Sequence, residues 1–242
     1  MKNAIESYLN SLSEDILTLS IDGRKVTKLP DLTRFKNLKE LYCSDNKLKS
    51  LPILPQSLEI LYCSGNKFTS LHSLPQNLKQ VYFTNNELSS LPTLPQSLEK
   101  LYCSSNKLSS LPTLPQNLKL LECCNNQLST LPNLPQGLET LFCFDNQITY
   151  LPILPEKIVF IYWNNPIYNI LDNDNNSLMK VKKNIQILNN FRHLNYSLQF
   201  KKKFIKWLWK SREKKIMEKY HPIYLLENLE ENSDLDEFLN NW

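Results

Sequence analysis

Apolar and polar residues recur along most of this chain in a pattern that repeats every twenty residues. Each unit contains a short stretch in which they alternate, as in Leu101-Tyr102-Cys103-Ser104, and this alternation predicts a strand with one buried face. An asparagine follows the stretch at the same place in six units, namely Asn46, Asn66, Asn86, Asn106, Asn126 and Asn146. A fixed period near twenty residues predicts a solenoid whose units stack on their neighbours.

The remaining positions of each unit predict how the chain turns and returns. The asparagine amide is expected to bond backbone groups where the chain leaves the strand, so that stacked amides form a buried polar ladder. A Leu-Pro-x-Leu-Pro frame recurs from Leu51 to Pro155. Two prolines three residues apart do not fit inside a helix, because each lacks an amide donor and clashes with the preceding turn. We therefore expect an extended, polyproline-like return segment.

These positions fit the leucine-rich-repeat pattern, with Leu98, Leu101, Cys103, Asn106 and Leu108 in its slots. With the Leu-Pro frame included, the stretch from about Ile16 to Tyr168 resembles the short leucine-rich repeats of secreted bacterial effectors that act inside host cells. The resemblance implies an α/β fold, a leucine-rich-repeat solenoid with a parallel β-sheet on its concave face and an extended convex side. Cysteine replaces the usual valine in the strand, and the tail does not resemble the catalytic domain that some effectors carry.

Three segments are expected from the chain in order. Residues 1–15 contain Ile5, Tyr8, Leu9 and Leu12 at helical spacing and are predicted to cap the open end of the solenoid. Residues 16–170 are predicted to form the solenoid, with about seven strands. Residues 171–242 lose the period and are predicted to form a C-terminal α-helical cap, basic and then acidic.

The tail separates its charges along the chain. Lys180 to Lys219 contains thirteen Lys or Arg against two Glu, whereas Leu225 to Trp242 contains six acids and no base. Aromatic and aliphatic residues at helical intervals predict an amphipathic basic helix carrying Lys201, Lys202, Lys203, Lys206, Lys210 and Trp207. Three interpretations stay open, which are a solvated cap on the last repeat, attraction to an anionic membrane, and nucleic-acid binding. A last helix is expected near 233–242.

The segment from Trp207 to Trp242 also resembles the C-terminal segment of leucine-rich-repeat proteins of mimivirus-type giant viruses of amoebae. The matching residues run from Trp207 to Pro222 and include Leu225, Leu226, Asp236 and Trp242. This resemblance implies a viral origin and host-directed binding. It supplies no catalytic residue.

The outward strand positions predict a partner-binding surface on the concave face. One row runs Tyr42, Tyr62, Tyr82, Tyr102, Glu122, Phe142 and Tyr162, with Phe144 and Phe160 in the rows beside it. Aromatic residues of this kind anchor protein partners. The alternative is that tyrosine suits a strand and stacks on its own neighbours. A second row alternates in sign from Lys39 to Glu139 and is interpreted as a device that fixes register.

The chemistry of the side chains favours a non-enzymatic protein. Five of the six cysteines occupy one apolar slot, with Phe83 and Trp163 filling it elsewhere, so reduced thiols and a cytoplasmic setting are expected. Only Cys124 is expected to be exposed. We found no phosphate loop, metal spacing, signal peptide or membrane span, and we expect no cofactor, metal or small-molecule substrate. The sequence thus predicts a protein-protein interaction module, with membrane or nucleic-acid docking as the alternative.

Overall fold

The computed structural model describes residues 2–171 and 178–219 of the 242-residue chain. It divides into two compact units, residues 1–186 and residues 187–242, and each is described by itself. The first unit contains a sheet, two helices and the first turns of a third helix, whereas the second unit contains the rest of that helix.

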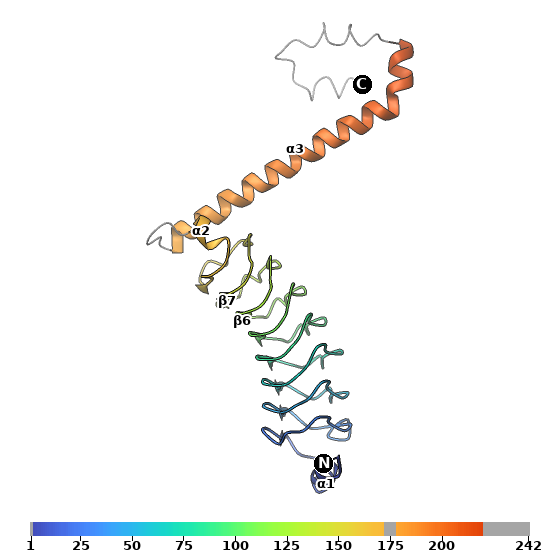
Figure 1. Ribbon diagram of the computed structural model, residues 1–242, viewed down its shortest axis with the longest axis vertical. Coiled ribbons are helices and arrows are strands. Elements are labelled where there is room, and N and C mark those ends of the chain that lie inside the picture. The colour runs from blue at the N-terminus through green and yellow to red at the C-terminus, as the bar shows by residue number, and fades with distance from the viewer. Residues whose placement is uncertain (1, 172–177, 220–242) are drawn as a thin grey trace. The chain divides into compact units, whose positions relative to one another are not determined.

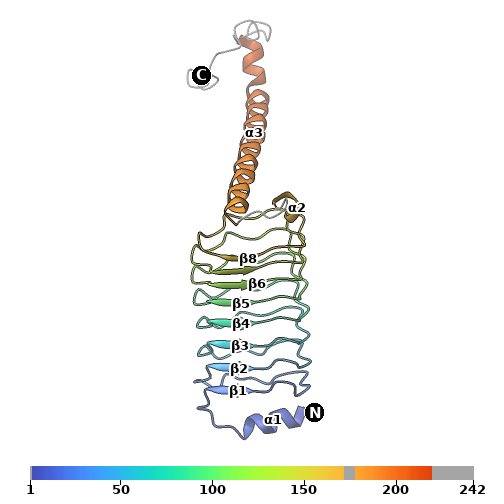
Figure 2. The same ribbon diagram turned by 90° about the vertical axis from the view of Figure 1, so that its left-hand side faces the viewer.

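Eight short parallel strands are hydrogen-bonded in chain order. Figure 2 shows them stacked from β1 to β8, and Figure 1 shows that they line the inner side of a curved solenoid, with the return segments outside. This arrangement confirms the predicted fold class and has one strand more than expected. The strands are β1 Thr18–Ser20, β2 Glu40–Tyr42, β3 Ile60–Tyr62, β4 Gln80–Tyr82, β5 Lys100–Tyr102, β6 Leu120–Glu122, β7 Thr140–Phe142 and β8 Val159–Ile161.

The hydrophobic core lies behind the strands. In β2 to β7 the central residue is buried, and the two flanking residues are partly exposed on the other face. Leu61, for example, pairs in register with Leu41 and Val81, and all three side chains have no exposed surface. A fully buried leucine contributes about 1.5–3 kcal/mol to folding, and every repeat adds several such side chains. The alternation of apolar and polar residues in the sequence therefore correctly predicts which face of the sheet packs against the core.

The predicted asparagine ladder is present behind the strand ends. The Asn66 Oδ1 atom accepts a hydrogen bond from the Leu48 amide at 3.0 Å, and its Nδ2 atom donates to the carbonyl oxygens of Cys43 and Cys63 at 2.9 and 3.2 Å. The same set of bonds recurs at the asparagines of the neighbouring repeats. Each side chain thus satisfies backbone groups of its own repeat and of the preceding one.

A tight turn precedes each asparagine and was not anticipated from the sequence. Asp45, Asn85, Asn125 and their equivalents have φ angles near +50° to +60°, a left-handed conformation that few side chains adopt readily. Gly65 takes this place in one repeat with φ +64°, and a Cβ atom there would approach the Asp45 Oδ1 atom to 2.3 Å. Small polar residues are therefore required at this position for backbone reasons.

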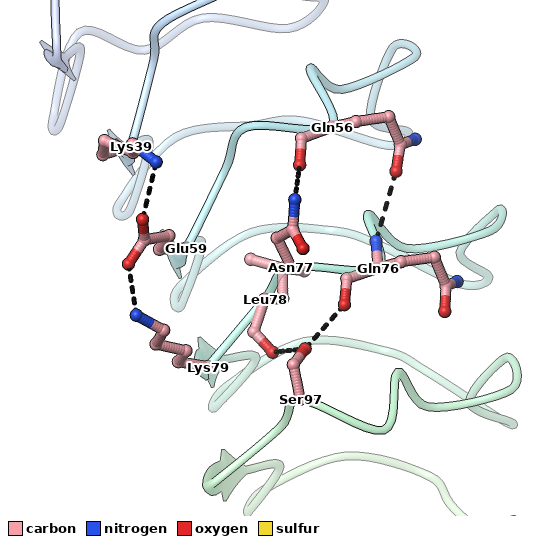
Figure 3. Close-up of polar contacts among 8 residues, drawn as sticks. All are labelled: Lys39, Gln56, Glu59, Gln76, Asn77, Leu78, Lys79 and Ser97. Atoms are coloured by element: carbon pink, nitrogen blue, oxygen red, sulfur yellow. Dashed lines mark hydrogen bonds and ion pairs between the residues drawn. The ribbon is translucent and has the colours of Figure 1, made fainter.

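The return segments are extended, and their prolines lie outside helices as predicted. Polar side chains join successive returns (Figure 3). Asn77 Nδ2 donates to the Gln56 carbonyl at 2.9 Å. Ser97 Oγ lies 2.7 Å from the carbonyl oxygens of both Gln76 and Leu78, which share its one hydroxyl hydrogen. These bonds satisfy carbonyl groups that proline-rich segments cannot pair in a regular ladder.

The last repeat is one residue shorter than the regular period of twenty, and this corrects three predictions. Thr140 pairs with Val159, so Phe160 lies in register with the buried Leu141 and Ile161 takes the outward position opposite Phe142. Tyr162 consequently fills the buried slot that the cysteines occupy elsewhere, and it has only 8% exposed surface. Trp163, expected in that slot, is exposed.

Helices lie at both ends of the first unit. The helix α1 (Lys2–Asn10) buries Ile5 and Leu9 in the core at the N-terminal end. A short helix α2 (Tyr168–Leu171) follows β8, and the long helix α3 is Leu178–Lys219. The first turns of α3 bury Val181 and Ile185, and Lys182 Nζ donates to the Pro155 carbonyl at 2.7 Å.

Candidate functional site

Four tyrosines form a continuous stack on the outward face of the sheet. The ring centroids of Tyr42 and Tyr62 lie 4.5 Å apart, those of Tyr62 and Tyr82 4.2 Å, and those of Tyr82 and Tyr102 4.3 Å, with interplanar angles of 8° to 16°. Parallel strands about 4.8 Å apart bring identical slots to nearly the spacing of stacked rings. The rings therefore stack on their own neighbours, as the alternative interpretation of the sequence expected, and they also remain partly exposed, while partner binding stays a prediction.

The tyrosine hydroxyl groups are held by neighbours on the same strands. Tyr42 Oη donates to Glu40 Oε2 at 3.0 Å, and Tyr82 Oη donates to Gln80 Oε1 at 3.1 Å. The hydrogen bond to Glu40 raises the pKa of Tyr42, and burial raises the pKa values of Tyr62 and Tyr82. These phenols stay protonated at neutral pH, so the row presents neutral rings and hydroxyl groups.

Glu122 interrupts the aromatic row. It pairs in register with Tyr102 on one side and Phe142 on the other. Burial raises the pKa of the Glu122 carboxyl group, and the charge of Glu122 contributes to the raised pKa of Tyr102. The carboxylate therefore lies close to the end of the tyrosine stack, in surroundings drier than bulk water.

Apolar side chains continue the surface beyond Glu122. Phe144 stacks on Trp163 with ring centroids 4.5 Å apart, and 46% of Trp163 is exposed. An open depression of about 690 Å³ adjoins this pair, lined by Asn146, Trp163, Asn164, Asn165, Pro166 and Tyr168. Phe142 and Phe144 thus lie where the sequence predicted an apolar region, whereas Tyr162 does not belong to it.

The charged residues that directly precede the strands form ion pairs between neighbouring repeats (Figure 3). Glu59 lies between Lys39 and Lys79, with an N–O distance of 2.7 Å to each. These two lysines lower the pKa of Glu59 to about 2. Lys119 pairs with Glu99 at 3.4 Å, and Lys107 pairs with Glu87 at 2.9 Å in a second row that the sequence analysis missed. Exposed pairs of this kind contribute little to stability because water screens them, which suits a role in register.

The thiols offer no reactive centre. All six cysteines are free and buried, including Cys124, which corrects the expectation that it is exposed. Its thiol lies within hydrogen-bonding reach of the Ser104 hydroxyl and the Phe144 backbone, and burial raises its pKa to about 11. Burial raises the pKa of Cys103 and Cys123 further. The side chains that the structure describes include no cluster of three or more metal-ligating residues.

The basic segment is helical as predicted and belongs mostly to the second unit. Lys201, Lys202, Lys203 and Lys206 are exposed on α3, and Phe200, the residue before Lys201, is 72% exposed. Lys210 and Trp207 lie on the same helix, but their side chains are outside the described set, as is the whole of the predicted last helix near 233–242. Among the described residues, no helix is long and apolar enough to cross a bilayer.

Stacked parallel coils with a twenty-residue period, a buried asparagine ladder and extended returns define a leucine-rich-repeat solenoid. Family models described as "Leucine Rich repeats (2 copies)" and "Leucine Rich Repeat" match residues 36–76 and 97–118. The chain belongs to the leucine-rich-repeat family. Proteins of this family typically act as non-enzymatic interaction modules that bind other proteins.

Two solved structures of bacterial proteins are similar to the solenoid. The first is YopM from Yersinia enterocolitica, at 37% identity and a TM-score of 0.60 over 64% of this chain and 34% of YopM. The second is a Shigella effector leucine-rich-repeat domain, at 34% identity and a TM-score of 0.55 over 62% of this chain and 67% of that domain. The chain therefore spans about a third of the length of YopM. A search of curated proteins returned no significant match.

Proposed function

We propose that this protein is a non-enzymatic module that binds a host protein on the concave face of its sheet. The observation that carries the proposal is the stack of four partly exposed tyrosine rings, which Phe142 follows after the interruption at Glu122. Tyrosine gives a large contact area with few rotatable bonds, so little entropy is lost when a partner covers it. Stacking orders these rings before binding, which lowers that cost further.

The similarity to bacterial effectors supports a host protein as the partner. Effector proteins work in a foreign cell, and the buried reduced thiols suit a host cytoplasm. A viral origin rests on the resemblance of residues 207–242, of which residues 220–242 lie outside the described part of the chain. The bacterial structures reported above do not support it, and it stays a prediction.

The test compares capture of host-lysate proteins by the natural chain and by a variant with Tyr62, Tyr82 and Tyr102 replaced by serine. Because the three rings are only partly buried, we expect the variant to fold and to lose the captured partner. A matched control replaces Ile53, which is 75% exposed on a return segment, with serine. Capture that survives the tyrosine replacements, or that is lost equally with Ile53→Ser, would refute concave-face binding.

A second proposed function is docking of α3 on an anionic surface. Its motivation is the exposed basic group Lys201, Lys202, Lys203 and Lys206 beside the exposed ring of Phe200. We expect vesicles rich in anionic lipid, or an oligonucleotide, to bind the full chain less tightly as salt rises, and to bind a variant with the four lysines changed to glutamine hardly at all. Binding that does not depend on salt would remove this candidate.

A further inference from the structure

The tyrosine stack stops at one position where the strand pairing continues unbroken. Along β2 to β5 each strand contributes one ring, and the centroids are 4.2–4.5 Å apart. At the next step β6 offers Glu122 in the same register position, and β7 resumes the row with Phe142. Glutamate ends well short of the hydroxyl of a tyrosine. We call the position between Tyr102 and Phe142, where this shorter carboxylate side chain interrupts the row of rings, the Glu122 slot.

The width of this slot suits one planar group. Two strand spacings, about 9.6 Å, separate the positions of Tyr102 and Phe142. Each step of the existing stack takes 4.2–4.5 Å, so a flat group inserted over Glu122 would lie one stacking distance from the ring of Tyr102. The face of Tyr102 that points away from Tyr82 is the next stacking surface in the row.

The side chain in the slot is a carboxylate. Among the side chains that the structure describes, none forms a hydrogen bond or ion pair with the Glu122 carboxylate. Lys119, three residues before Glu122, pairs with Glu99 at 3.4 Å. Lys100 occupies the diagonal position on β5, where side chains stand about 7–8 Å apart. Partial burial disfavours an isolated carboxylate, so a cation that covers it gains more here than at an open surface.

We propose that this slot binds an arginine side chain of the protein partner, with the guanidinium stacked on Tyr102 and paired with Glu122. A guanidinium is flat and stays charged, it stacks on aromatic faces, and it bonds a carboxylate through two parallel N–H groups. A lysine ammonium offers the charge without the plane and is more strongly hydrated. The inference rests on the proposed function, since it names the residue by which a partner engages the concave face.

The experiment follows ring and backbone NMR signals of the full chain during titration with N-acetylargininamide. We expect saturable shifts centred on Tyr102, Glu122 and Phe142, with a dissociation constant on the order of 1 mM for so small a probe. The citrulline analogue, which is planar but neutral, and the lysine analogue are each expected to bind at least about fivefold more weakly. Equal binding of citrulline, or no saturation by about 50 mM arginine probe, would overturn the proposal.

Two variants separate the slot from general charge effects. Glu122→Gln keeps the shape and is expected to weaken the arginine probe about tenfold, whereas Glu139→Gln removes one charge from the row that directly precedes the strands and is expected to change it less than twofold. Glu122→Tyr fills the slot with a fifth ring, so it should remain folded and show no specific shifts. Equal effects of Glu122→Gln and Glu139→Gln would also count against the slot.

The outcome is distinguishable from failure of the proposed function. If the serine variant of the tyrosine row loses the host partner but Glu122→Gln retains full capture, concave-face binding holds and the arginine slot is wrong. If the arginine probe binds as described but neither change affects capture, the slot exists and the proposed function fails. Loss of capture in both variants supports both proposals together.

Discussion

Replacing Asn86 with alanine isolates the contribution of the asparagine ladder to stability. The Asn86 Oδ1 atom accepts from the Phe68 amide at 3.1 Å, and its Nδ2 atom donates to the carbonyl groups of Cys63 and Phe83 at 3.1 and 3.0 Å. Asn86 itself is only 8% exposed, so water cannot readily replace it. Alanine would leave two or three buried backbone groups unpaired.

The size of the effect follows from the number of unpaired groups. A buried donor or acceptor without a partner costs about 1–3 kcal/mol, and relaxation or an entering water recovers part of this, so we expect a loss of about 3–5 kcal/mol. The matched control is Asn117→Ala. Asn117 is exposed and donates one bond, to the Gln96 carbonyl at 3.0 Å, so its loss should cost about 0.5–1 kcal/mol.

Urea unfolding followed by far-ultraviolet circular dichroism measures both variants, and hydrogen exchange reports the Phe68 amide directly. We expect a clear fall in the urea midpoint for Asn86→Ala, with loss of protection strongest at Phe68 and in the two adjoining repeats. A fall in the free energy of unfolding no larger than that of Asn117→Ala, or an unaltered exchange rate of the Phe68 amide, would refute the argument that the asparagine amides stabilise the turns.

Three further outcomes are expected. Glu59→Gln should lower the free energy of unfolding at pH 7 by no more than about 1 kcal/mol. The pKa of Glu59 is about 2 in the folded chain against 4.5 when unpaired, so the natural chain should lose this advantage as the pH falls from about 4.5 to 2, as measured by acid titration of both proteins. Phe83→Ala should cost about 3–5 kcal/mol by urea unfolding because the ring is fully buried, while Ile53→Ser should stay within about 0.5 kcal/mol. A thiol reagent at pH 8 should leave all six cysteines unmodified in the folded chain and modify six on denaturation, and fast labelling of Cys124 before unfolding would contradict its raised pKa.

The fold could be predicted from the sequence because the repeat length is constant where the strands are regular. Every twentieth residue occupies the same slot, so one correct alignment placed Leu61, Tyr62 and Asn66 and their equivalents together. The same reasoning failed where the spacing changed. The final repeat is one residue shorter than twenty, and a shift of one residue exchanges the two faces of a strand. The constant period therefore predicted Tyr162 on the surface, whereas the structure buries it in the core.

The candidate site was only partly predictable. The tyrosine row follows from the period alone, but the ring distances depend on how side chains settle between strands. Cys124 is buried between adjoining repeats, with its thiol near the Ser104 hydroxyl and the Phe144 backbone, and no local sequence pattern encodes that arrangement. The missing partner of Glu122 likewise becomes visible only when the neighbouring charges are placed in space.

Because the regular repeats contact one another through equivalent strand pairings and asparagine hydrogen bonds, one whole repeat can be removed without changing the kind of contact between those that remain. Removal of twenty residues, for example 87–106, would join Asn86 to Lys107 in the sequence context that already follows Asn106. Such a deletion would shorten the sheet by one strand and leave the first and last repeats unchanged. The length of the concave face can therefore be adjusted in increments of one strand without redesigning the fold.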